Sequence, residues 1–163
     1  MQLIESPWGH IDFCATLIED VAYVVGTPSH GGIMIYRNNS VVTLSPEALK
    51  EAQSWRNWLC YEEDCAWHIP VYESNVLLTA YIEENADHFN ESTLEYHIDR
   101  HREALALMFP EYLILHEYRQ WIERAQDGET FTASVTLRAN GGVPWQYVSR
   151  IEAGEKLSFH YEP

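Results

Sequence analysis

Alternation of apolar and polar side chains near both ends of the chain constrains the fold more than any other feature. From residue 10 to residue 17, the odd positions carry Ile, Phe, Ala and Leu, and the even positions carry His, Asp, Cys and Thr. The segment "TFTASVTLR" at residues 130–138 has the same period. Successive side chains of a strand point to opposite faces, so this period predicts half-buried strands in both places.

Shorter apolar runs extend the strand prediction. Residues 21–25, 33–36 and 41–44 are β-branched and aromatic runs separated by the turn sequences "GTPSHGG" and "NNS". Together with the alternating segment before them, they predict a meander of three or four antiparallel strands. After the turn sequence "NGG", residues 145–151 and 156–161 are predicted to form further strands.

A helix start follows the meander. In "SPEALKEAQSWRNWL", residues 45–59, Ser45 is placed to cap a helix and Pro46 stands at its first position. The spacing of Leu49, Ala52, Trp55 and Leu59 predicts one apolar face along this helix.

The middle of the chain is predicted to be mainly helical. "CAWHIPVY", residues 65–72, looks like a short strand limited by Pro70. Helices are predicted over residues 74–88, 92–108 and 110–126, and the last two are separated because the residue before a proline avoids the helical conformation.

The order of strands, helices and strands favours the α+β class over a regular βαβ alternation. We expect an antiparallel β meander and C-terminal strands packed with a central helical block. The 163 residues, 46% of them hydrophobic, are enough for one core, which predicts a single domain over residues 1–163.

The compartment is predicted from cysteine usage and hydropathy. The chain has an odd number of cysteines, Cys14, Cys60 and Cys65, and their spacing is not that of a disulfide framework. This favours reduced thiols and a cytoplasmic location. Apolar runs fall far short of the ~20 residues of a bilayer span, and no basic and apolar leader is visible at the start. We therefore expect neither a membrane segment nor a secretory signal.

Negative charge is concentrated in the middle of the chain. The net charge is −15, and residues 57–99 contain ten carboxylates without any Lys or Arg. Direct nucleic-acid binding depends on cations that contact phosphates, so this composition argues against it. A basic protein or nucleoprotein complex is the expected partner, and a homodimer is also possible.

Three short motifs carry a family resemblance: "SPWG" at residues 6–9, "TPSHGG" at 27–32 and "YEEDCAW" at 61–67. In this order they resemble an uncharacterised domain family found in proteins of plasmids, phages and other mobile elements. The resemblance covers roughly residues 6–70 and fades beyond Pro110. It implies a mobile-element origin and a bacterial host cytoplasm, but no established activity.

The turn "TPSHGG" presents a candidate reactive histidine. Pro28 fixes one backbone dihedral and the two glycines allow a tight turn, so His30 is expected on an accessible loop. If Cys65 lies nearby, His30 could act as the general base of a nucleophilic site that includes Asp64. Alternatively, the glycines only form a hairpin turn and His30 bonds to backbone.

The three consecutive carboxylates Glu62, Glu63 and Asp64 raise the pKa of the Cys65 thiol, which argues against a thiolate. They suit a cation or a cationic partner better. As metal ligands they would need His30, His68 or Cys65, and side chains that alternate along a strand cannot all converge on one ion. A solvated or helix-capping acidic turn is the alternative.

His97 and His101 are spaced as i and i+4, which places both imidazoles on one helix face, as in some zinc sites. His101 also continues the apolar stripe between Ile98 and Leu105, which predicts a buried histidine with a hydrogen-bond partner. No complete ligand set is visible, so we expect no metal and no cofactor.

Like charges recur along the predicted helices and add a repulsive cost of about 0.2–0.5 kcal/mol per pair. Solubility is one explanation. The other is charge mimicry of nucleic acid, by which a non-enzymatic mobile-element protein would inhibit a host CRISPR or restriction complex. A small enzyme built on His30 and Cys65 is the alternative function. The predicted binding residues are Glu62, Glu63, Asp64, Glu83, Glu84, Asp87, Glu91, Glu95 and Asp99.

Overall fold

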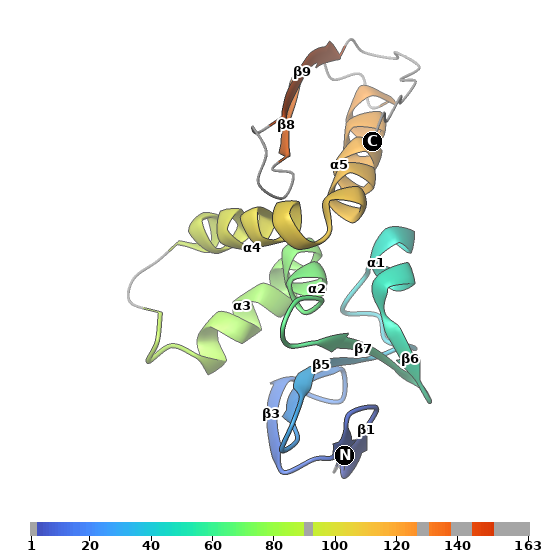
Figure 1. The fold of residues 1–163 in the computed structure, drawn as a ribbon, viewed down its shortest axis with the longest axis vertical. Coiled ribbons are helices and arrows are strands. Elements are labelled where there is room, and N and C mark those ends of the chain that lie inside the picture. Colours follow the sequence, from blue (N-terminus) through green and yellow to red (C-terminus); the bar gives the residue numbers. More distant parts are fainter. Residues whose placement is uncertain (1–2, 90–92, 127–130, 138–144, 152–163) are drawn as a thin grey trace. The chain divides into compact units, whose positions relative to one another are not determined.

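The computed structural model describes residues 3–89, 93–126, 131–137 and 145–151. The chain divides into two compact units, Met1–Leu105 and Ala106–Pro163. Figure 1 labels most of the elements of both units. The sheets are antiparallel, and most of the helices form one block between the N-terminal and the C-terminal strands, which confirms the α+β class. The prediction of a single domain stays a prediction.

A five-stranded antiparallel sheet with the order β3-β4-β5-β7-β6 forms the centre of the first unit. The first three strands are the predicted meander, and β7 joins it through the pairing of Gly32 with Glu62. The strands are β3 (Phe13–Ile18), β4 (Ala22–Gly26), β5 (Gly31–Tyr36), β6 (Gln53–Trp55) and β7 (Trp58–Glu62).

The two faces of this sheet are covered differently. A short hairpin, β1 (Glu5–Ser6) with β2 (Gly9–His10), carries Trp8 at its turn. Trp8 packs against a buried cluster that includes Met34 of β5 and Cys60 of β7. On the other face, the Tyr61 hydroxyl donates a hydrogen bond of 2.9 Å to the Ala48 carbonyl. The sheet therefore packs against the hairpin on one face and against a helix on the other.

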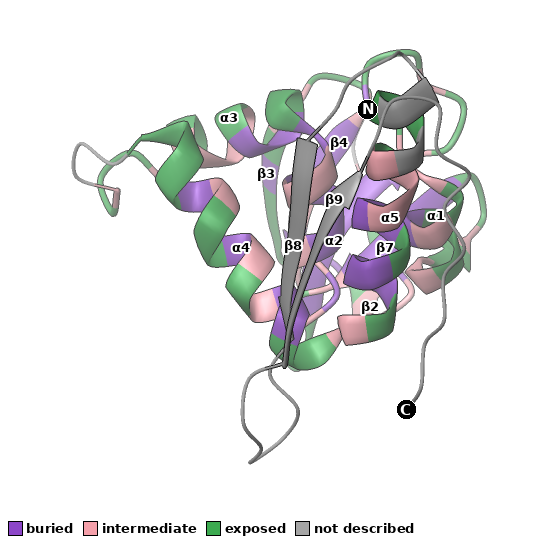
Figure 2. Ribbon diagram, turned by 90° about the horizontal axis from the view of Figure 1, so that it is seen from above, coloured by how far each residue is buried: buried purple, intermediate pink, exposed green. Residues whose placement is uncertain are grey.

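Among the described residues of the first unit, four helices begin, and the fourth continues past the boundary of the unit. Ser45 caps the first by accepting a hydrogen bond from the Ala48 amide, with Pro46 at the first helical position, as predicted. Buried residues line α2 and strands β4 and β7, where Figure 2 is purple. The helices are α1 (Pro46–Glu51), α2 (His68–Glu73), α3 (Asn75–Glu84) and α4 (Leu94–Met108).

The predicted helix over residues 45–59 was wrong beyond Glu51. The chain becomes extended at Ala52, and Arg56 adopts a left-handed φ of 53° between β6 and β7. Residues 58–61 are a continuous buried apolar run, typical of a strand covered on both faces. Pairing of this run with β5 therefore outweighs the helical spacing of the apolar residues.

Three other element predictions are corrected. Residues 65–72 are a turn followed by α2, because Pro70 is tolerated in the first turn of a helix. Residues 41–44 form no strand, since the Asn39 side chain accepts hydrogen bonds from the Val41 and Val42 amides and holds a turn. Helix α3 ends at Glu84, four residues earlier than predicted.

The second unit contains α5 (Pro110–Gln126), as predicted, and an antiparallel hairpin of β8 (Phe131–Leu137) and β9 (Trp145–Ile151). The predicted strand over residues 156–161 lies outside the described residues. Among the helices that the structure describes, none has the length and hydropathy to cross a bilayer.

Candidate functional site

The loop between β4 and β5 presents His30 to solvent, as the turn sequence predicts. Thr27 closes the loop, because its hydroxyl donates to the His30 carbonyl at 2.7 Å while its amide donates to the same oxygen at 2.8 Å. The His30 amide donates back to the Thr27 hydroxyl oxygen. The His30 side chain remains 56% exposed.

The two glycines after His30 permit close approach of the strand that carries the carboxylates. A Cβ at Gly32, whose φ is +154°, would collide with the Tyr61 carbonyl and lie 2.7 Å from the Trp8 ring. A Cβ at Gly31 would lie 2.6 Å from the Glu63 carboxylate. The motifs "SPWG", "TPSHGG" and "YEEDCAW" therefore meet at one place in the fold.

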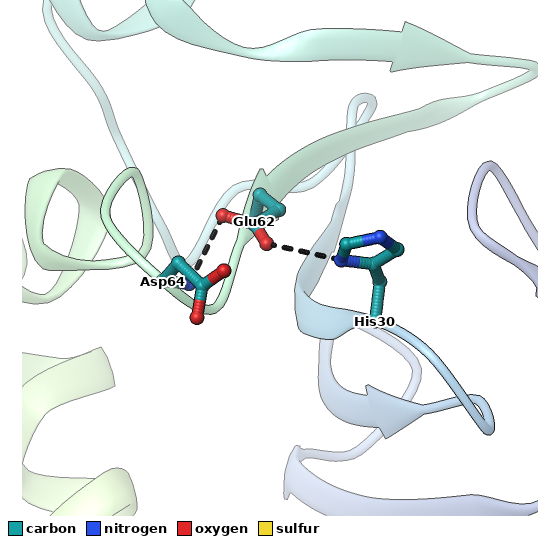
Figure 3. Close-up of side chains that lie close together, drawn as sticks. All are labelled: His30, Glu62 and Asp64. Carbon is teal, nitrogen blue, oxygen red and sulfur yellow. Dashed lines mark hydrogen bonds and ion pairs between the residues drawn. The ribbon is translucent and has the colours of Figure 1, made fainter.

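Glu62 is the centre of the candidate site, at the end of β7 (Figure 3). One carboxylate oxygen lies 3.6 Å from His30 Nδ1, and the other accepts a hydrogen bond of 3.0 Å from the Asp64 amide. The chain turns after Glu62, and Asp64 lies in this turn with its carboxylate close to that of Glu62. Ligand atoms of His30, Glu62 and Asp64 all lie within 4.8 Å of one another.

Cys65 is half-buried beside the same carboxylate. Its Sγ lies 3.8 Å from Glu62 Oε2, so the thiol and the imidazole of His30 contact different oxygens of Glu62. Burial and then the Glu62 charge raise the pKa of the Cys65 thiol, with Asp64 adding to the effect. The predicted direction is confirmed, and the thiol is poorly suited to serve as a nucleophile at neutral pH.

His97 and His101 are both buried, and the predicted burial of His101 is confirmed at 5% exposure. The His101 partner is His68 of α2, with the two Nδ1 atoms 2.8 Å apart. Trp67 packs against both rings, and Tyr81 packs against Trp67. Within the described residues, the potential metal-binding group is His30, Glu62 and Asp64 and does not include His97 or His101.

The sequence interpretation missed the pairing of His68 with His101. Residues 65–72 were predicted as a strand, so nothing indicated that His68 begins a helix beside α4. The signal was the aromatic and imidazole content of "CAWHIPVY", which suits a ring cluster as well as it suits a strand.

Most of the predicted binding carboxylates are exposed, and Glu62 is half-buried. Asp87 lies in a turn beyond α3, so its charge does not add to the predicted repulsion within that helix. Glu91 lies outside the described residues. The exposed ones are Glu63, Asp64, Glu83, Glu84, Asp87, Glu95 and Asp99.

Residues 1–127 match the model of a family described as "Domain of unknown function (DUF7007)". The chain belongs to this family. The DUF7007 match includes all three motifs and extends well past residue 70, the approximate limit of the motif resemblance, to the end of α5. It confirms membership in a family without an assigned activity. No curated protein and no solved structure matches the chain.

Proposed function

We propose that this DUF7007 protein is a non-enzymatic binding protein whose exposed carboxylates dock on a basic protein surface. The observation that supports this is the concentration of exposed carboxylates in a segment that itself contains no Lys or Arg. Residues 57–99 hold ten carboxylates and no Lys or Arg, and seven of those that the structure describes are exposed.

Two carboxylates of this segment, Glu62 and Glu73, contact other residues of the protein and therefore have structural roles. Glu73 accepts hydrogen bonds from the Ser45 amide and hydroxyl, so it anchors α1 to α2. Glu62 contacts His30 and Cys65. The exposed members of α3 and the following turn, such as Glu84 and Asp87, are the better candidates for contacts with a partner.

The proposed partner is a host nucleic-acid-dependent defence factor, such as a CRISPR or restriction complex. Duplex DNA carries one charge per about 1.7 Å, so a channel that binds it is rich in cations that clustered carboxylates can occupy. The mobile-element setting implied by the motif resemblance favours this class of partner. The protein would act in the cytoplasm of a bacterial host.

A charge-reversal pair tests the proposal. Glu84→Lys with Asp87→Lys should abolish both binding to the purified complex and the block on its DNA binding. Asp12→Lys with Glu19→Lys is the matched control, because it changes the net charge equally at exposed positions of the β3 region. Binding of the natural chain should also weaken between about 0.1 M and 1 M salt, as the screening length falls from about 10 Å to 3 Å. Equal losses in both variants, each folded, would reject a localised binding surface.

A small enzyme built on His30 and Cys65 is the second candidate. The contact of both side chains with Glu62 favours it, whereas the raised thiol pKa opposes it. Covalent labelling of Cys65 by an electrophilic substrate, lost in His30→Asn, would support this candidate.

A further inference from the structure

We propose that His30, Glu62 and Asp64 form a binding site for a divalent transition-metal ion. This inference goes beyond the proposed function and does not depend on it. The site combines an imidazole from the β4-β5 loop with two carboxylates from the end of β7 and the turn that follows (Figure 3).

The spacing of the ligand atoms fits coordination of one ion. Two ligands bound to a tetrahedral ion at about 2.0–2.1 Å lie roughly 3.3 Å apart. His30 Nδ1 and Glu62 Oε1 are 3.6 Å apart, and the Asp64 oxygen completes a group whose atoms all lie within 4.8 Å. On binding an ion, the exposed Asp64 side chain would rotate to bring its oxygen to the same distance.

The backbone brings these ligands together through the strand ladder. Gly32 pairs with Glu62, and the Glu63 amide donates a hydrogen bond of 3.0 Å to the Gly31 carbonyl. A side chain at Gly32 would collide with the Tyr61 carbonyl of β7, whereas one at Gly31 would collide with the Val25 carbonyl of β4, so Gly32 is the residue that allows this approach. The imidazole and the carboxylates are therefore held close by backbone pairing and not only by their mutual attraction.

The donor set selects the class of ion. One imidazole nitrogen with two carboxylate oxygens suits Zn²⁺, Mn²⁺, Fe²⁺ or Co²⁺, whereas Mg²⁺ and Ca²⁺ favour oxygen ligands alone. With three protein ligands and an exposed His30, the ion would keep at least one position open to water. This arrangement is that of an accessible site and not of a closed structural one.

Calorimetric titration of the full chain with Zn²⁺, and separately with Co²⁺, tests the site. We expect one ion per chain, at least tenfold weaker binding in His30→Asn and in Glu62→Gln, and a higher unfolding temperature of the natural chain with Zn²⁺. His10→Asn is the matched control, because His10 forms a similar exposed pair with Glu5 at 3.4 Å but belongs to no three-ligand group within the described residues.

Two results would overturn the site: no saturable binding of either ion at one per chain, or equal weakening in His30→Asn and His10→Asn. Circular dichroism is used to check that each variant is folded. The charge-reversal pair at Glu84 and Asp87 leaves all three ligands in place, so it should bind Zn²⁺ normally even if it loses its protein partner. Failure of one proposal is thus distinguishable from failure of the other.

Discussion

His68 and His101 share a hydrogen bond between their Nδ1 atoms at 2.8 Å, so one imidazole donates and the other accepts. The contact joins the start of α2 to α4 across 33 residues of chain. Burial lowers the pKa of His68 to about 4, and burial together with the nearby His68, His97 and Arg100 lowers the pKa of His101 to about 3. Both rings are therefore neutral in the folded protein at neutral pH.

This pair predicts a loss of stability in mild acid. A histidine in the unfolded chain has a pKa of about 6.5. Between this pH and the lower pKa values of His68 and His101 in the folded protein, the unfolded chain binds more protons than the folded chain. The contribution of the two imidazoles to the free energy of unfolding is fully present above about pH 6.5. It decreases as the pH falls, by at most about 1.4 kcal/mol per pH unit for each imidazole. Denaturant unfolding at pH 5 and pH 7.5 measures the change. His101→Gln should flatten the dependence.

Gly32→Ala is predicted to prevent folding or to cost more than about 4 kcal/mol, because the added Cβ collides with the Tyr61 carbonyl at a backbone φ of +154°. Gly9→Ala is the control for backbone strain alone, since Gly9 has φ +123° and open space around its Cβ position. It should cost about 1–2 kcal/mol. Similar losses in the two variants, measured by denaturant unfolding, would contradict the close contact between β5 and β7.

Ser45→Ala is predicted to destabilise the protein by about 1–2 kcal/mol. The hydroxyl accepts from the Ala48 amide at 3.1 Å and donates to Glu73 at 2.5 Å, so the helix cap and one of the two hydrogen bonds to Glu73 of α2 are lost. Ser45→Thr keeps the hydroxyl and should recover most of the stability. A thermal unfolding midpoint of Ser45→Ala equal to that of the natural chain would show that neither contact contributes.

The cysteines are predicted to alkylate in the order Cys14, Cys65, Cys60. Cys14 is exposed, Cys65 is half-buried, and burial raises the pKa of Cys60 to about 12. Glu62→Gln should accelerate alkylation of Cys65, because the Glu62 charge and hydrogen bond help to raise its pKa. Glu63→Gln is the control. Mass spectrometry over time gives the three rates, and an unchanged Cys65 rate in Glu62→Gln would rule out the electrostatic effect.

Features encoded by neighbouring residues could be predicted from the sequence. The Ser45 cap, the start of α5 at Pro110 and the exposed His30 loop all follow from local backbone preferences. Residues 53–62 could not be predicted in this way. The apolar spacing up to Leu59 fits a helix, whereas in the structure β7 pairs with β5, which is distant in the sequence, and β6 pairs with β7.

The candidate site was predictable only in part for the same reason. The sequence indicated His30 and the acidic turn as separate candidates, but their proximity depends on which residue of β7 faces Gly32. The contact between His68 and His101 likewise depends on packing between α2 and α4, which the misassigned strand at residues 65–72 concealed.

The pairing of Gly32 with Glu62 also protects the chain against an alternative alignment of its sheet. A slip of one residue between β5 and β7 would turn every side chain of β7 to the opposite face, exposing or misplacing Tyr61 and Cys60, which are both buried. The same slip would carry the Glu62 carboxylate away from His30. A molecule that has the correct core therefore also has the complete candidate site. Occupancy of the site would report the fraction of molecules that are correctly folded.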